Sequence, residues 1–225
     1  MKIFIVAGHG GTDPGAGANN TDERAEAIKL VDQAITILKP VTLPGQNVIR
    51  VPHDLALEQG VQYINHNSQD PANDICLEIH FNSNVGSPGT GTETYYGFKK
   101  LAEIMQKNLV ATLKLPDRGV KYGDYLYFNR ETKPGSALLE IGFINNANDL
   151  KVVREMGALA IAKGVSEYLG LILPTPTPPP TCPNGFCGSG ETCSNCAVDC
   201  GACPTATPTP TPTGGGATAT PTKTP

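Results

Sequence analysis

Several features of common protein classes are missing from this chain. No run of apolar residues approaches the ~18 needed to cross a bilayer, so the sequence predicts no membrane span. It has 17 Lys and Arg against 21 Asp and Glu, a formal net charge of −4 and no basic run, so nucleic acid is not an expected partner. The zinc motif H-E-x-x-H and the nucleophile elbow G-x-S-x-G are absent, so a serine hydrolase using Ser83 or Ser136 has no supporting motif.

The chain also begins without a recognisable signal peptide. Residues 1–8 are too few to form one, and they lead directly into His9. If the protein acts outside its cell, either the true start lies upstream or the protein leaves by another route, such as lysis.

Cysteine is almost missing from residues 1–173, where only Cys76 occurs, in an expected strand and as a buried free thiol. The composition then changes. Thr-Pro repeats predict an extended linker over 174–181 and a low-complexity tail over 205–225. Residues 182–204 form a cysteine-rich module between them. We therefore expect one well-buried domain at 1–173, followed by three smaller parts.

The cysteine-rich module has two explanations. Its six cysteines follow the spacing C-x4-C-x5-C-x2-C-x3-C-x2-C. The pairs Cys193–Cys196 and Cys200–Cys203 resemble zinc knuckles, but only three residues separate them, far fewer than the ~15–20 of typical zinc ribbons. Three disulfides in a small module without a hydrophobic core fit better, and the spacing leaves their pairing open.

Strand and helix patterns alternate through the first 173 residues. Apolar, β-prone runs predict strands, and apolar residues at helical spacing predict helices. The expected strands cover 2–7, 47–51, 74–82, 92–96 and 138–144, and the expected helices cover 22–38, 55–67, 99–113 and 149–169. The segment 118–130 reads as irregular. This alternation predicts an α/β domain with a twisted, mostly parallel sheet flanked by helices on both faces.

Four side chains fall where such a fold places its chemistry. His9 follows the first strand in a glycine-rich loop, Glu23 begins the next helix, and His80 and Glu140 lie in later strands. If these strands are parallel neighbours, their carboxyl ends meet at one edge of the sheet. Two imidazoles and a carboxylate can hold Zn²⁺ and leave a position for water. Glu140, in an apolar strand, would have a raised pKa and could serve as general acid and base.

These residues also have ordinary structural explanations. A strand histidine such as His80 is more often a hydrogen-bonded core residue than a metal ligand. An unpaired carboxylate in an apolar strand is costly to bury. This cost favours a functional explanation for Glu140 over a structural one. From the residues alone, the sequence predicts a metal-dependent hydrolase of undefined substrate.

Three stretches of the sequence resemble a known family, and this resemblance implies a substrate. The segments VAGHGGTDPGA (6–16), EIHFNS (78–83) and LLEIGFINN (138–146) resemble the amidase-3 family of zinc-dependent N-acetylmuramoyl-L-alanine amidases. Their order and separation match as well, and the resemblance covers about residues 2–171. It implies an enzyme with Zn²⁺ as cofactor that cleaves the amide between N-acetylmuramic acid and L-alanine in peptidoglycan, at the cell wall. We expect such an enzyme to be a monomer.

The resemblance also assigns roles by position. It implies that His9, Glu23 and His80 are the zinc ligands and that Glu140 is the catalytic acid and base. It leaves two alternatives of another class open: a peptidoglycan-binding module with an inactive site, and a zinc peptidase that acts on wall peptides.

Four further positions bear on the site. Asn82 and Arg118 are candidates for substrate binding, the latter in a segment, Arg118-Gly-Val-Lys, that resembles the family. Glu26 lies one helical turn beyond Glu23 and could compete as ligand, although the length of the following helix favours Glu23. Glu78 stands where the family more often has a small residue, and it either orients His80 or is a solvated charge at the strand end.

The family's regulated members carry an inserted helix over the zinc site. The span from His80 to Glu140 contains one ordinary helix and no long insert, so the chain resembles the unregulated members. Both a phage lysin and a host enzyme of wall remodelling fit the sequence.

Overall fold

The computed structural model describes residues 1–173. The expected linker at 174–181, the cysteine-rich module at 182–204 with its disulfides, and the tail at 205–225 lie outside the described residues and stay predictions. Among residues 1–173, no helix combines the length and the apolar character that a membrane crossing requires.

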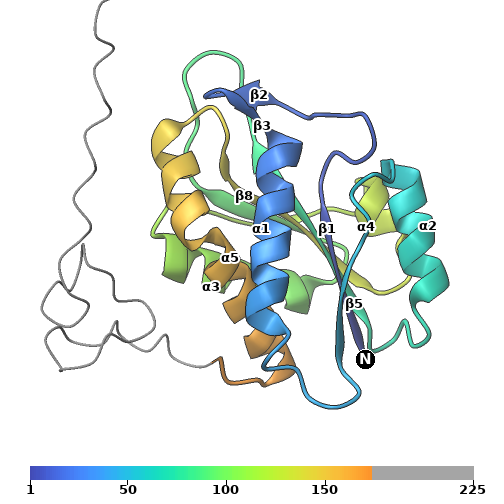
Figure 1. The fold of residues 1–225 in the computed structure, drawn as a ribbon. Coiled ribbons are helices and arrows are strands. Elements are labelled where there is room, and N and C mark those ends of the chain that lie inside the picture. The colour runs from blue at the N-terminus through green and yellow to red at the C-terminus, as the bar shows by residue number, and fades with distance from the viewer. Residues whose placement is uncertain (174–225) are drawn as a thin grey trace, which may run out of the picture. The chain divides into compact units, whose positions relative to one another are not determined.

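One sheet forms the centre of the described domain (Figure 1). Its strand order is β4-β1-β5-β8-β6-β7. The strands are β1 (Lys2–Ala7), β4 (Asn47–Arg50), β5 (Ile75–Asn82), β6 (Thr92–Tyr96), β7 (Asp117–Tyr122) and β8 (Gly135–Phe143). The first four in spatial order are parallel, whereas β6 pairs antiparallel with β8, and β7 is parallel to β6. A small antiparallel pair, β2 (Gly17–Ala18) with β3 (Thr21–Asp22), lies in the loop after β1.

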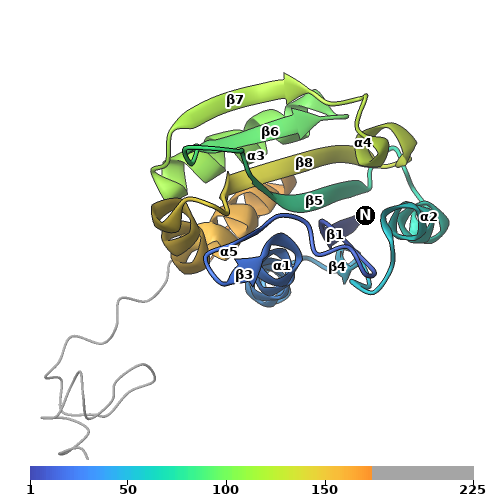
Figure 2. The same ribbon diagram turned by 90° about the horizontal axis from the view of Figure 1, so that it is seen from above.

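Helices cover the two faces of this sheet unequally (Figure 2). They are α1 (Glu23–Leu38), α2 (Leu57–Asn67), α3 (Lys99–Leu113), α4 (Tyr127–Glu131) and α5 (Ala147–Leu169). The helices α1, α3 and α5 pack with Ile3, Ile5 and Leu77 in the larger core. The helices α2 and α4 pack with Phe4 and Cys76 in a smaller core. The expected mostly parallel sheet with helices on both faces is confirmed.

The alternation of side chains along β1 explains why it is central. Ile3 and Ile5 are fully buried in the larger core, and Phe4 between them is fully buried in the smaller one. Burial of each such side chain contributes about 1.5–3 kcal/mol to stability. A strand that is apolar on both faces is stable only inside a sheet covered on both sides.

The first helix begins where the sequence suggests. Asp22 is its N-cap, and its carboxylate accepts a hydrogen bond from the backbone N–H of Ala25 at 2.7 Å. This cap sets Glu23 as the first helical residue. The helix dipole also favours a carboxylate at this place.

The prediction of irregular structure over 118–130 was wrong. This segment contains most of β7 and the helix α4. The strand is at the edge of the sheet and none of its residues is fully buried, so it lacks the apolar run of a central strand. The helix has five residues, too few to show helical periodicity.

Smaller differences occur at the ends of elements. The strand expected at 138–144 is β8, which begins earlier, at Gly135. The helix expected from residue 149 is α5, which begins at Ala147, because the Asn146 side chain accepts hydrogen bonds from the N–H groups of Asn148 and Asp149. The helix expected from residue 55 begins at Leu57.

Candidate metal centre

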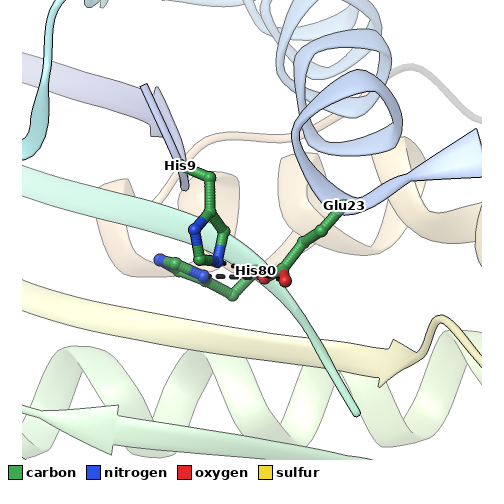
Figure 3. A group of neighbouring side chains, drawn as sticks. All are labelled: His9, Glu23 and His80. Carbon is green, nitrogen blue, oxygen red and sulfur yellow. Dashed lines mark hydrogen bonds and ion pairs between the residues drawn. The ribbon is translucent and has the colours of Figure 1, made fainter. Parts of the chain in front are cut away.

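His9, Glu23 and His80 come together at the carboxyl edge of the parallel strands (Figure 3). His9 follows the end of β1, Glu23 is the first residue of α1, and His80 lies near the end of β5. Each offers one ligand atom, and these atoms lie within 4.8 Å of one another. This is the only such group of three or more His, Cys, Asp or Glu side chains found within residues 1–173.

Glu23 holds the two histidines together. Its Oε1 lies 2.8 Å from Nδ1 of His80, and its Oε2 lies 3.1 Å from Nε2 of His9. The backbone N–H groups of Phe81 and Ala16 donate to the same carboxylate, at 3.0 and 3.2 Å. The carboxylate is therefore fixed from both strand and loop, with its two oxygens directed at two different rings.

The far nitrogen of each ring meets another carboxylate. Nδ1 of His9 lies 2.8 Å from Oδ2 of Asp13, and Nε2 of His80 lies 3.3 Å from Oε2 of Glu78. Metal-binding histidines commonly donate their second N–H to a carboxylate in this way. Glu78 is 4% exposed, so the alternative that it is a solvated strand-end charge is wrong. Sequence reasoning missed Asp13, for which the only signal is its place four residues after His9 in the same glycine-rich loop.

Glu26 is directed elsewhere. Its carboxylate accepts from Arg154 through two nitrogens, each at 2.8 Å, from Lys29 at 2.9 Å and from the hydroxyl of Thr21 at 2.8 Å. The bonds to Arg154 lower the pKa of Glu26 to about 2. This carboxylate is thus occupied by cations, and it is not part of the group formed by Glu23 and the histidines.

Glycines let the loop approach the rings. A Cβ on Gly8 would lie 2.4 Å from ring atoms of His80. Gly15 has φ +68°, and a Cβ there would lie 2.6 Å from the ring of His9. His9 itself has φ 58°, a left-handed conformation that is rare for a residue with a side chain. A non-glycine residue in this conformation is worth attention as a functional position.

The three groups stabilise one another's charges. Burial disfavours the ionised form of Glu23, but its hydrogen bonds to His80 and His9 dominate and lower the pKa of Glu23 to about 2. The bond to Glu23 raises the pKa of His9. Burial lowers the pKa of His80, but Glu78 and Glu23 outweigh it and raise that pKa well above its ordinary value. The site therefore concentrates negative charge around two ring nitrogens, an arrangement that favours a bound cation.

Glu140 lies beside this group. It is the direct partner of His80 in the pairing of β5 and β8. Its Oε2 is buried and has no hydrogen-bond partner among residues 1–173. Burial raises the pKa of Glu140 to about 7, despite the opposing effect of His80. A carboxyl with this pKa can both accept and donate a proton near neutral pH.

Asn82 and Arg118 meet at a buried carboxylate, that of Glu93. Nδ2 of Asn82 donates to Oε1 of Glu93 at 3.0 Å, and Nε of Arg118 donates to Oε2 at 2.6 Å. Lys121 and the hydroxyl of Tyr95 donate to the same carboxylate, at 2.6 and 2.9 Å. Glu93 is 2% exposed. The sequence analysis did not predict Glu93 as a site residue, because its position at the site depends on the reversed direction of β6.

A cavity of about 380 Å³ opens next to the histidines. Its lining includes His9, His80 and Glu78, and also Tyr127 and Phe128 of α4. The short helix α4, which the sequence did not predict, thus contributes aromatic side chains to the lining of the cavity beside the candidate metal centre.

Fold and site together define an α/β protein with a His/Glu/His candidate metal centre and a partly buried carboxyl beside it. Comparison with known protein families identifies the family of this chain. The model of the family described as N-acetylmuramoyl-L-alanine amidase matches residues 3–169, and the chain belongs to this family. The resemblance stated from the three sequence segments is confirmed at the level of the family.

The chain is also similar to individual proteins along most of residues 1–173. The chain is 33% identical over 181 residues to the uncharacterized protein YqiI of Bacillus subtilis, an alignment covering 74% of this chain and 84% of YqiI. It is equally identical, over 181 residues, to the N-acetylmuramoyl-L-alanine amidase LytC of the same species, covering 74% of this chain but 35% of LytC. The solved catalytic domain of the amidase CwlV from Bacillus (Paenibacillus) polymyxa var. colistinus is 31% identical, with a TM-score of 0.63, covering 76% of this chain and 99% of that one.

Proposed function

We propose that residues 1–173 hydrolyse the amide between N-acetylmuramic acid and L-alanine in peptidoglycan, at the cell wall, with Zn²⁺ as cofactor. The observation that carries this proposal is the meeting of His9, Glu23 and His80 beside the raised-pKa carboxyl of Glu140. Membership of the amidase family supports the choice of bond and substrate.

The donor set fits zinc. Two imidazole nitrogens and one carboxylate are a common set of protein ligands in catalytic zinc sites, which keep a further position open. The nitrogens that would bind are Nε2 of His9 and Nδ1 of His80, since their other nitrogens face Asp13 and Glu78. Bound zinc would supply Lewis acidity, which polarises a carbonyl and lowers the pKa of water.

Glu140 is the group that moves protons in this proposal. Its carboxylate accepts a proton from the attacking water, and the resulting carboxylic acid donates it to the nitrogen of the departing alanine. The hydroxyl adds to the carbonyl carbon, the C–N bond breaks, and Glu140 returns to its starting form. In the metal-free protein, burial raises the pKa of Glu140 to about 7, a range in which a carboxyl can both accept and donate a proton near neutral pH.

Asp13 and Glu78 act as positioning residues. Each accepts from the ring nitrogen opposite the one that would bind metal, so each favours the tautomer that leaves the lone pair on the metal-binding nitrogen. Glu78 does so from inside the protein, whereas Asp13 has a largely exposed side chain.

The experiment is digestion of purified peptidoglycan by the full chain, with mass spectrometry of the products. We expect peptides that begin with a free L-alanine amine and glycan strands that retain a free lactyl carboxyl. A chelator should stop the release, and added Zn²⁺ should restore it. Cleavage inside the peptides would identify a peptidase instead, and binding without any product would identify a binding module.

A further inference from the structure

The buried carboxylate of Glu93 anchors two cations, Arg118 and Lys121, which we call the cation pair. Both reach Oε2 of Glu93 at 2.6 Å. Glu93 is 2% exposed, whereas the side chains of Arg118 and Lys121 are 39% and 38% exposed. The group thus carries two positive charges against one negative charge, and its positive side faces solvent.

The cation pair is held in place. Tyr95 and Asn82 occupy the other oxygen of Glu93, so the carboxylate cannot rotate away without losing four donors. Nζ of Lys121 lies 5.6 Å from the centre of the Tyr95 ring. Cations fixed before a ligand arrives lose little conformational freedom on binding, which favours affinity and selectivity.

The sheet register places the cation pair at a defined distance from the proposed chemistry. Glu93 is the direct partner of Glu140 in the antiparallel pairing of β6 and β8, so both side chains project from the same face. Neighbouring strands lie about 4.8 Å apart, so β7 is about 10 Å from β8. A peptide residue spans about 3.5 Å. A group on the second residue of a peptide, counted from the scissile amide, can therefore reach the cations that lean from β7 toward β6.

We propose that Arg118 and Lys121 bind the free carboxylate on the second residue of the stem peptide, and so select substrates that carry this carboxylate over those with a carboxamide. This rests on the proposed function, since it assigns the peptide side of the scissile bond to the β6–β7 side of Glu140. A carboxylate accepts charge-assisted hydrogen bonds from both cations, whereas a neutral amide cannot match them.

The competing explanation is structural. Arg118 and Lys121 lie in the edge strand and bridge it to Glu93 of β6, so they could serve only to hold β7 in the sheet. That role predicts a change in stability and no preference between substrates. A test must therefore measure the ratio of two substrates as well as activity.

The probes are two N-acetylmuramoyl tripeptides, L-Ala-γ-D-Glu-L-Lys, with the α-carboxyl of the second residue either free or amidated. We expect wild-type full chain to cleave the free carboxylate form with a kcat/KM ~10–100-fold higher. Lys121→Gln should reduce this ratio toward one, chiefly by slowing the carboxylate substrate, while Lys121→Arg should keep most of it. Lys107→Gln is the matched control: it removes an equally cationic lysine on α3, which pairs with Glu167 of α5, and it should leave the ratio unchanged.

Three outcomes overturn the subsite. The first is equal cleavage of both substrates by wild type, which by itself suffices even if Lys121→Gln does not fold. The second is a Lys121→Gln variant that folds and keeps the wild-type ratio, whether or not it slows both substrates by the same factor. Failure to cleave either tripeptide, together with no release from intact peptidoglycan, rejects the proposed function, and the subsite with it.

Discussion

Glu140 stands directly opposite His80 across the parallel strands β8 and β5. The proposed proton carrier and a proposed metal ligand are therefore fixed by one ladder of backbone hydrogen bonds rather than by a flexible loop. Sites built on paired strands hold their geometry more closely than sites on loops. The same ladder keeps Glu140 partly desolvated, which is the cause of its raised pKa.

The two neighbouring glutamates of α1 give a matched test of the ligand set. Glu23→Gln should lose most bound zinc, because a neutral amide replaces the carboxylate that faces both histidines. Glu26→Gln should keep zinc but lower the free energy of unfolding by about 1–2 kcal/mol, because it weakens the bonds to Arg154. Metal content of the purified variants and urea unfolding check the pair. Zinc retained in Glu23→Gln and lost in Glu26→Gln would reverse the assignment.

Glu78 allows a test of how His80 is oriented. Glu78→Ala should weaken zinc affinity by ~10–100-fold, because the imidazole loses the acceptor on its Nε2 side. Glu78→Gln should recover much of the affinity, because its amide oxygen can still accept that hydrogen bond. Competition with a chelator of known affinity measures both. If Glu78 were only a buried charge, Ala and Gln would change stability and leave zinc affinity as it was.

The proposed proton carrier gives the sharpest test of the reaction. Glu140→Gln keeps the size of the side chain and removes its acid–base function, so kcat should fall by ~10²–10⁴. Zinc content should stay near one per chain, because Glu140 is not among the three grouped ligands. Specific activity per bound zinc, measured on soluble muropeptides, is the decisive quantity. A value near wild type would remove Glu140 from the mechanism.

Most of the centre could be predicted because it lies on parallel strands. His9, His80 and Glu140 stand near the carboxyl ends of β1, β5 and β8, which are neighbours, and such ends share one edge. Glu93 could not be found in this way. It lies near the start of β6, which runs in the opposite direction, and only that reversal brings the start of the strand to the active edge.

Asp13 could not be predicted as a partner of His9, for a different physical reason. Its contact with His9 depends on a loop in which His9 and Gly15 both have positive φ, and no side-chain pattern reports such a conformation. The choice of Glu23 over Glu26 also needed the structure, since both are buried acids in the first turn of α1. The two residues differ because Arg154, 128 residues away in the sequence, donates hydrogen bonds to the carboxylate of Glu26.

The raised pKa of Glu140 also predicts how stability depends on pH. A carboxyl with an ordinary pKa of 4.5 in the unfolded chain and about 7 in the folded protein binds its proton more tightly when folded. The metal-free protein should therefore lose stability as pH rises from 4.5 to 7, by up to about 3 kcal/mol from this group. Glu140→Gln lacks the titrating group, so its free energy of unfolding should exceed that of wild type increasingly across this range.

Urea unfolding of the metal-free full chain at several pH values between 4 and 8 measures this difference. The other titrating groups are common to both proteins, so their effects largely cancel in the comparison. Glu155→Gln, on the exposed side of α5, is the control and should follow wild type at every pH. Added Zn²⁺ should shrink the difference between wild type and Glu140→Gln, because a cation beside His80 favours the ionised form of Glu140. Parallel curves for wild type and Glu140→Gln in the absence of metal would mean that Glu140 is solvated in solution, and would remove the basis for its role as proton carrier.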